Sequence, residues 1–280
     1  MRRLLRRGAM RYVAPWYVTE EAPADLVDLL ARGVRPTCLD AAALHGLWVP
    51  IDDRVHAFAP RTARTLAVDL GMARQIRRRR DHETGMRTDV AGSRQGPVVL
   101  HGPVLQAWPT LDPVPDLDLV LSHAGRCLPV VSAAILFESS VETGALALGE
   151  AQNIVASLPH GRRRALSRIR GDAESGTETF VRWWFESRRF EVRSQVWIAA
   201  DHRADMLVGR SWIIECDSRA FHDDPAQYRK DRERDLRSRA LGYTVTRLTW
   251  EQVFVTWDQT EQALLAVLAR GDHRRALPGR

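Results

Sequence analysis

Acidic side chains close an apolar run in the C-terminal half of the chain. Residues 212–214 are apolar and lead into Glu215, Cys216 and Asp217, while Asp205 lies ten residues upstream in a second strand-like run. Because side chains alternate between the faces of a strand, Glu215 and Asp217 share a face and Cys216 points the other way. Pairing of the two strands brings Asp205 to the same place. Three carboxylates at a sheet edge require a cation or a basic partner, so we expect a hard-metal site.

A further acidic residue, Glu178, lies in an expected helix over residues 175–189. Its spacing from Val181 and Phe185 places it on the inward, apolar face of that helix. Ser175 and Glu178 also have the spacing of a capping box, in which Glu178 bonds the amide of Ser175. Both interpretations stay open, and the two roles are compatible.

Composition restricts the class of protein. A chain of 280 residues with 45% hydrophobic content has room for one large domain or two of ordinary size. No apolar run approaches 18 residues, and the basic N-terminus lacks the apolar stretch of a secretory signal, so we expect a cytoplasmic protein with no membrane partner. The cysteines Cys38, Cys127 and Cys216 are far apart and form no CxxC pair. We therefore expect reduced, buried thiols rather than a zinc or redox centre.

The net charge of +6 permits a polyanionic partner. Arginine supplies almost all the positive charge, and Lys230 is the one lysine in the sequence. Basic residues concentrate at 77–80, 162–164 and 229–234. In the last run arginines alternate with acids, which also fits a solvated, salt-bridged helix face.

The distribution of apolar runs and breakers divides the chain into four regions: a small mixed segment over 1–70, a mixed α+β connecting region over 71–171, an α/β domain over 172–270 and a basic tail over 271–280. In the first two we expect a hairpin at 10–18, helices at 2–7, 24–31 and 38–47, strands at 55–59, 98–100 and 119–121, and helical structure at 129–170. In the third we expect a helix at 175–189, strands at 190–198, 203–208 and 211–217, a helix at 225–241, a strand at 243–248 and helices at 250–270. This αβββαβα order predicts a mixed sheet flanked by helices.

Ordered motifs over residues 172–270 resemble one known domain. They are Ser-Gly-Thr-Glu178, Arg-Ala-Asp205, Ile-Glu-Cys-Asp217 with His222 following, Lys-Asp-Arg232, and the stretch from Gly242 to Glu251. Together they resemble the Vsr-like (very short patch repair type) branch of the PD-(D/E)XK restriction-endonuclease superfamily. The resemblance implies a restriction-endonuclease-like fold, DNA as partner and Mg²⁺ or Mn²⁺ as cofactor. Members usually carry glycine where Ser218 stands.

The resemblance also implies roles for individual residues. Asp205 and Glu215 are the implied metal ligands, and Glu178 is the supporting helical acid. Asp217 stands where the superfamily usually has a lysine, and Lys230 is a candidate relocated lysine. His222 is a candidate proton shuttle, or else a loop histidine bonded to a neighbouring aspartate. The implied contacts to the DNA backbone are Arg229, Arg232, Arg234 and Arg237.

The N-terminal region has a weaker resemblance of its own. Residues 2–18 resemble the tail of a winged helix-turn-helix followed by its wing, and residues 41–48 resemble the next block of AbiEi-type antitoxin proteins. The first helices of a helix-turn-helix are missing, which indicates a misplaced start or a truncated DNA-reading head. The leading hypothesis is a metal-dependent DNA endonuclease or nickase of the repair or defence type. The alternatives are a non-catalytic, antitoxin-like DNA-binding regulator and an RNA-cleaving enzyme, and a homodimer stays open.

Overall fold

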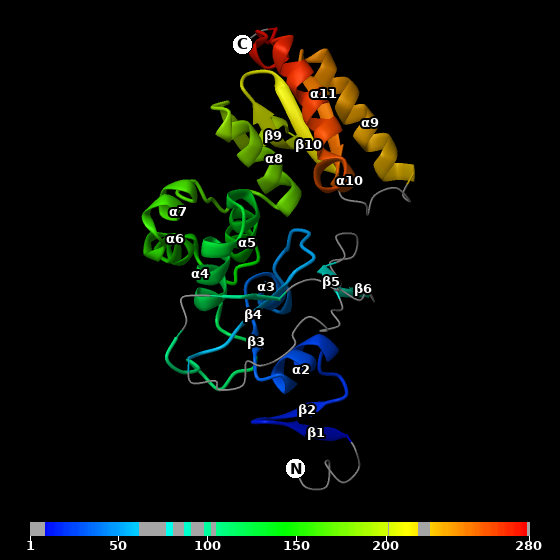
Figure 1. Ribbon diagram of the computed structural model, residues 1–280. Coiled ribbons are helices and arrows are strands. Elements are labelled where there is room, and N and C mark those ends of the chain that lie inside the picture. Colours follow the sequence, from blue (N-terminus) through cyan, green and yellow to red (C-terminus); the bar gives the residue numbers. More distant parts are fainter. Residues whose placement is uncertain are drawn as a thin grey trace. The chain divides into compact units, whose positions relative to one another are not determined.

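The chain folds as a mixed α/β protein with two compact units. The computed structural model describes residues 9–61, 77–80, 87–90, 98–101, 105–200, 202–217 and 225–278 (Figure 1). The first unit comprises Met1–Arg80, Arg87–Phe137 and Gly149–Arg168, and the second contains Glu138–Leu148 and Ile169–Arg280. Within the described residues, no helix combines the length and the apolar character needed to cross a membrane.

Short strands and helices build the first part of the first unit. The predicted hairpin is confirmed, with Met10 paired to Thr19. The elements in order are β1 (Met10–Val13), β2 (Trp16–Thr19), α2 (Ala24–Ala31), β3 (Arg35–Pro36), α3 (Cys38–Leu44), β4 (Val55–Phe58), β5 (Arg77–Arg80), β6 (Arg87–Val90) and β7 (Val98–Leu100). One sheet has the order β3-β4-β7, in which β4 and β7 run parallel, and β5 pairs with β6 in a separate hairpin. The predicted helix at 2–7 lies outside the described residues.

A run of helices follows and corrects one prediction. The helices are α4 (Leu117–Cys127), α5 (Val130–Glu142), α6 (Leu148–Ser157) and α7 (His160–Ala165). The predicted strand at 119–121 is wrong, because these residues lie inside α4. The helix buries Val120, Leu121 and Ala124, which lie on one face at a helical spacing. A run of three apolar residues is too short to distinguish helical from strand periodicity. Packing of the buried face in the tertiary structure favours the helix.

The second unit has the predicted αβββαβα order. Its elements are α8 (Gly176–Ser187), β8 (Val192–Ala199), β9 (His202–Val208), β10 (Trp212–Asp217), α9 (Pro225–Ala240), β11 (Thr244–Thr249), α10 (Trp250–Phe254), α11 (Trp257–Ala269) and the 3₁₀ turn η3 (Asp272–Arg274). The sheet order is β11-β10-β9-β8. Strands β10 and β11 are parallel, which requires the crossover that α9 supplies, whereas the other pairs are antiparallel.

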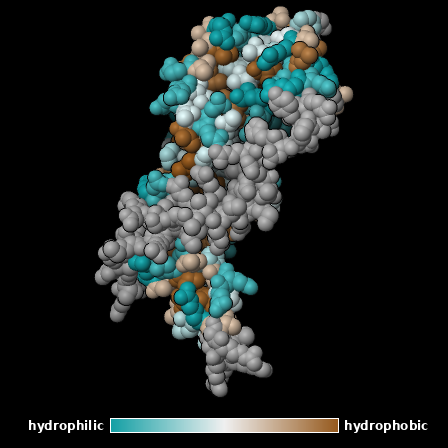
Figure 2. Space-filling model, turned by 90° about the vertical axis from the view of Figure 1, so that its right-hand side faces the viewer, coloured by the Kyte–Doolittle hydropathy of each residue, from teal (hydrophilic) through white to brown (hydrophobic). Residues whose placement is uncertain are grey.

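Both faces of this sheet are covered by apolar cores. On one face Trp212 and Ile214 pack with residues of α8, α10 and α11, among them Phe185, Val253 and Leu264. On the other face Ile213 packs with a second cluster: Ile198, Ala204, Leu207 and Tyr243. Strand β10 is therefore apolar on both sides until Glu215, as a central strand should be. In the view of Figure 2, hydrophilic and hydrophobic residues are mixed over the coloured part of the second unit, without one large hydrophobic patch.

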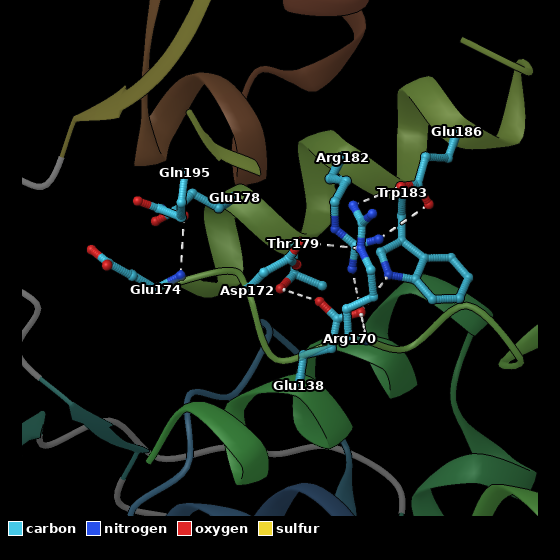
Figure 3. Close-up of polar contacts among 10 residues, drawn as sticks. All are labelled: Glu138, Arg170, Asp172, Glu174, Glu178, Thr179, Arg182, Trp183, Glu186 and Gln195. Carbon is cyan, nitrogen blue, oxygen red and sulfur yellow. Dashed lines mark hydrogen bonds and ion pairs between the residues drawn. The ribbon is translucent and has the colours of Figure 1, made fainter. Parts of the chain in front are cut away.

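A buried ion pair fixes α8, the helix that carries Glu178. Glu138 of α5 is almost fully buried and pairs with Arg182 of α8. It also accepts hydrogen bonds from the Thr179 hydroxyl at 2.9 Å, the Trp183 indole at 3.0 Å and the Arg170 amide at 3.2 Å (Figure 3). A buried carboxylate is stable only with such partners. The network therefore anchors α8 to the end of α5.

Candidate active site

Asp205 and Glu215 lie next to each other at the ends of two paired strands. Strands β9 and β10 are antiparallel, and Met206 stands opposite Ile214. At the neighbouring position of each strand, the Asp205 amide lies 3.5 Å from Glu215 Oε2. The Cys216 amide donates a hydrogen bond of 2.7 Å to Asp205 Oδ2. Strand pairing thus brings together two acids that the sequence separates by ten residues.

The three residues that close β10 divide between the two faces of the sheet. Cys216 packs against the core cluster that contains Trp212 and Ile214. Glu215 and Asp217, one residue to either side of it, belong to the opposite face. Cys216 is therefore a core residue, and the two carboxylates share the face next to Asp205.

Glu178 reaches the same region from the first turn of α8. Ser175 caps the helix by accepting a hydrogen bond of 3.1 Å from the Glu178 amide, and its hydroxyl lies 2.9 Å from Glu178 Oε1. The other oxygen, Oε2, accepts from the Glu174 amide at 3.0 Å and from Gln195 Nε2 at 2.9 Å (Figure 3). The predicted cap is confirmed, although the amide that bonds the carboxylate belongs to Glu174 rather than to Ser175. Capping and inward orientation coexist.

Crowding of these buried acids shifts their pKa values. Burial raises the pKa of Asp205 to about 9, and the neighbouring charges of Glu178 and Glu215 add to the effect. Burial also raises the pKa of Glu178 to about 7, although hydrogen bonds from Glu174, Ser175 and Gln195 oppose it. Both shifts arise because negative charge has too little compensation here. A nearby cation reverses such shifts, and perturbed acids of this kind mark functional sites.

Asp217, the second acid at the end of β10, is held in an ion pair. Arg247 Nη1 lies 2.8 Å from Asp217 Oδ1, and Arg247 Nη2 lies 2.9 Å from Asp235 Oδ1. Arg247 belongs to β11 and stands beside Glu215 in the parallel register. Partial burial acts to lower the pKa of Arg247, but Asp235, Asp217 and Glu215 raise it overall, so the guanidinium stays charged. A permanent positive charge therefore lies next to the acidic cluster.

His202, which the sequence did not single out, contacts Glu215 directly. Its Nε2 lies 3.0 Å from Glu215 Oε1, its Nδ1 lies 3.3 Å from the Ser238 hydroxyl, and the side chain is buried. His202 stands three residues before Asp205, so regular alternation would place the two on opposite faces. The structure nevertheless places both residues beside Glu215, at the end of β9 where its register with β8 is irregular: Trp197 pairs with Arg203 and Ala199 with His202. No pattern in the sequence marks Gln195 either. Its φ of 52° departs from regular strand conformation within β8, so strand alternation does not predict where its side chain lies.

The remaining predicted residues lie on or before α9. His222 is outside the described residues, and Arg229 and Lys230 belong to α9, whose side chains are described from Arg232 onward. Arg232 is exposed and lies 3.6 Å from Asp235. Arg237 is exposed and Arg234 is half-buried. The basic helix is thus present, and its contact with nucleic acid remains a prediction.

A different group of side chains in the first unit has the composition of a metal centre. One ligand atom from each of Cys38, His56, His101 and Cys127 lies within 4.8 Å of all the others. The three cysteines are free thiols, as expected, but Cys38 and Cys127 lie together in a group that could hold a metal ion although no CxxC pair marks it in the sequence. Among the described residues of the second unit, the acids form no group as close as this one. Mg²⁺ does not require that, because it uses one or two carboxylates together with waters and substrate phosphate.

Fold and site together define a mixed α/β protein with a cluster of half-buried acids at the ends of paired strands, next to the buried Glu178 of α8. The chain matches no protein-family model, and no curated protein or solved structure is significantly similar to it. The functional argument therefore depends on the geometry of these residues alone.

Proposed function

We propose that the protein is a metal-dependent nuclease that hydrolyses DNA phosphodiester bonds, with Mg²⁺ or Mn²⁺ as its cofactor. The observation that carries the proposal is the position of Asp205, which lies against Glu215 and near Glu178, where burial together with these two charges raises its pKa to about 9. Buried acids in such a cluster are unfavourable without a cation. A resident divalent cation gives the cluster a physical reason to exist.

The residues present suit that cofactor. Asp205 and Glu215 supply the carboxylate oxygens that Mg²⁺ prefers, and Glu178 supports them from α8. When bound, the metal lowers the pKa of a water molecule and offsets the charge that develops on the phosphodiester oxygens. The Cys216 amide orients Asp205, and Gln195 and Ser175 orient Glu178.

His202 and Arg247 complete the proposed site. His202 bonds Glu215 on one side and Ser238 on the other, a position from which it exchanges a proton with the acidic cluster. Arg247 places a fixed positive charge beside Glu215 and Asp217, close to where the superfamily has its lysine. Arginines of α9 hold the DNA backbone without reading its sequence: Arg229, Arg232, Arg234 and Arg237.

A second candidate is a non-catalytic DNA-binding regulator, and the Asp217–Arg247 pair favours it. An acid neutralised by an arginine stands where the wider superfamily usually has its catalytic lysine. In that case the acidic cluster has no catalytic role, and DNA binding depends on the arginines of α9 alone. RNA cleavage uses the same metal chemistry and is a third outcome of the same experiment.

The test is cleavage of supercoiled plasmid with Mg²⁺, Mn²⁺ or EDTA. Asp205→Asn and Glu215→Gln are compared with the wild-type chain and with Asp258→Asn, an exposed aspartate of α11 with the same charge change. We expect nicking that requires a metal and falls about 100-fold or more in the two site variants, and is unchanged in the control. Metal-dependent nicking that survives both substitutions refutes the site. If neither DNA nor labelled RNA is cleaved, the result favours the non-catalytic DNA-binding regulator.

A further inference from the structure

Four metal-ligating side chains from four elements of the first unit converge at one point. Cys38 begins α3, His56 lies in β4, His101 follows β7 and Cys127 ends α4. The parallel pairing of β4 and β7, with His56 opposite Val99, brings the two histidines together. Tertiary structure alone creates this group, since the four residues span ninety positions of the chain.

The distances within the group are close to those of a tetrahedral zinc centre. His56 Nδ1 lies 2.9 Å from His101 Nε2, and Cys127 Sγ lies 4.0 Å from His56 Nδ1. Zinc bonds of about 2.0–2.1 Å to nitrogen and about 2.3 Å to sulfur imply a separation of about 3.3 Å between two nitrogens and about 3.6 Å between nitrogen and sulfur. Shifts of a few tenths of an ångström therefore reach that geometry.

Burial and charge balance favour a bound cation. Cys38 and His56 are 0% exposed and His101 is 5% exposed, and the strand around His56 is apolar. Two thiolates and two neutral imidazoles balance the charge of one divalent cation. Such a centre can be buried at small electrostatic cost.

The surroundings of the group resemble a supporting shell for its ligands. Asp52 Oδ2 lies 3.7 Å from His56 Nε2, the ring nitrogen that faces away from the other ligands. Asp40 fixes the same strand position by accepting a hydrogen bond of 2.6 Å from the His56 amide. Cys38 has a φ of 52°, a left-handed conformation that costs free energy in a residue other than glycine. Carboxylates behind histidine ligands orient the rings and fix the tautomer.

We propose that Cys38, His56, His101 and Cys127 bind one Zn²⁺ that holds the first unit together. Soft thiolate and imidazole ligands select zinc over magnesium. Four protein ligands leave no open position for substrate, which is the arrangement of structural rather than catalytic zinc. The ion ties α3 and α4 to the β4–β7 pair. This role is independent of the nuclease proposed for the second unit.

The direct test is the metal content of the full chain purified without added chelator. We expect about one zinc per chain by mass spectrometry of the native protein and by elemental analysis. Replacement by Co²⁺ should give the visible bands of a tetrahedral site and a thiolate-to-cobalt charge-transfer band. A metal-free chain with a Cys38–Cys127 disulfide, or with two free thiols that do not take up Zn²⁺ or Co²⁺, overturns the proposal.

Substitutions assign the ligands. Cys38→Ser, Cys127→Ser and His101→Ala should each lose the zinc, whereas Cys216→Ser and His123→Asn should keep it. Cys216 is a cysteine of the second unit, and His123 is a buried neighbour whose Nδ1 bonds Thr37 at 2.8 Å, a contact that asparagine preserves. If a ligand variant fails to fold, the metal content and the Co²⁺ spectrum of the wild-type protein still decide whether the site exists. Stoichiometric zinc that persists in the three ligand variants overturns the assignment.

Discussion

Replacement of Asp205 by asparagine should stabilise the metal-free protein while it removes the proposed activity. Asparagine has nearly the same shape as aspartate, and its side-chain oxygen still accepts the Cys216 amide that now bonds Oδ2 at 2.7 Å. It carries no charge, so the repulsion from Glu178 and Glu215 disappears. The variant should therefore gain stability and lose activity. A substitution that only disturbed core packing would lower both.

The size of the effect follows from the pKa of Asp205. The value rises from 3.8 to about 9 on folding, so at pH 7 the group is ionised in the unfolded chain and protonated in the folded one. Each unit of this difference corresponds to about 1.4 kcal/mol, which gives a ceiling of about 4 kcal/mol at pH 7. Because Glu178 and Glu215 share the same repulsion, we expect about 2 kcal/mol for the single variant.

The direction of the pH dependence follows from the same shift. A carboxyl whose pKa is raised on folding leaves stability intact at low pH and lowers it as pH rises from about 4 towards 9. The free energy of unfolding of the Asn variant should therefore exceed that of the wild type by an amount that grows between pH 5 and pH 9. Mg²⁺ should reduce the difference, since it stabilises the ionised cluster of the wild type.

Urea unfolding in EDTA, followed by tryptophan fluorescence, measures this difference. Trp183 and Trp212 are buried in the second unit and report its unfolding. Asp258→Asn is the matched control and should change stability by less than about 0.5 kcal/mol at every pH. An Asp205→Asn variant that is less stable than the wild type at pH 8 in EDTA refutes the argument that the cluster is electrostatically strained.

Three other perturbations test the remaining parts of the structure. Glu138→Ala removes one of the two carboxylates that pair with the buried Arg182 and leaves only Glu186; it should lower the unfolding free energy of the second unit by about 3 kcal/mol, measured by urea titration, with exposed Glu233→Ala as the control. His202→Gln should lower the plasmid-nicking rate about 10²-fold or more, with metal binding by calorimetry unchanged. Asp52→Asn should weaken zinc affinity about 10–100-fold in competition with a chelating dye.

Each of these has a contrary result. A Glu138→Ala protein as stable as the wild type shows that the buried pair is replaceable. An unaltered nicking rate in His202→Gln removes this histidine from the chemistry. Unchanged zinc affinity in Asp52→Asn shows that the carboxylate does not support His56.

Much of the second unit could be predicted because its sequence patterns are local. The run 212–214 is apolar on both faces, and the structure makes it the central strand β10 with a core on each side. Gly242 has a φ of 92° between α9 and β11, the left-handed position that glycine favours, as the sequence indicated. Asp205 and Glu215 could be placed together because antiparallel pairing of neighbouring strands follows from a short connection.

Local patterns in the sequence are enough to predict the order of elements in the second unit and the acids at the end of β10. Only the tertiary structure placed His202 against Glu215, paired Asp217 with Arg247 and gathered Cys38, His56, His101 and Cys127 at one point. The reason is physical. Helix and strand periods act over a few residues and are visible in sequence, whereas contacts between distant residues, such as the 30 positions from Asp217 to Arg247 or the 71 from His56 to Cys127, depend on how whole elements pack.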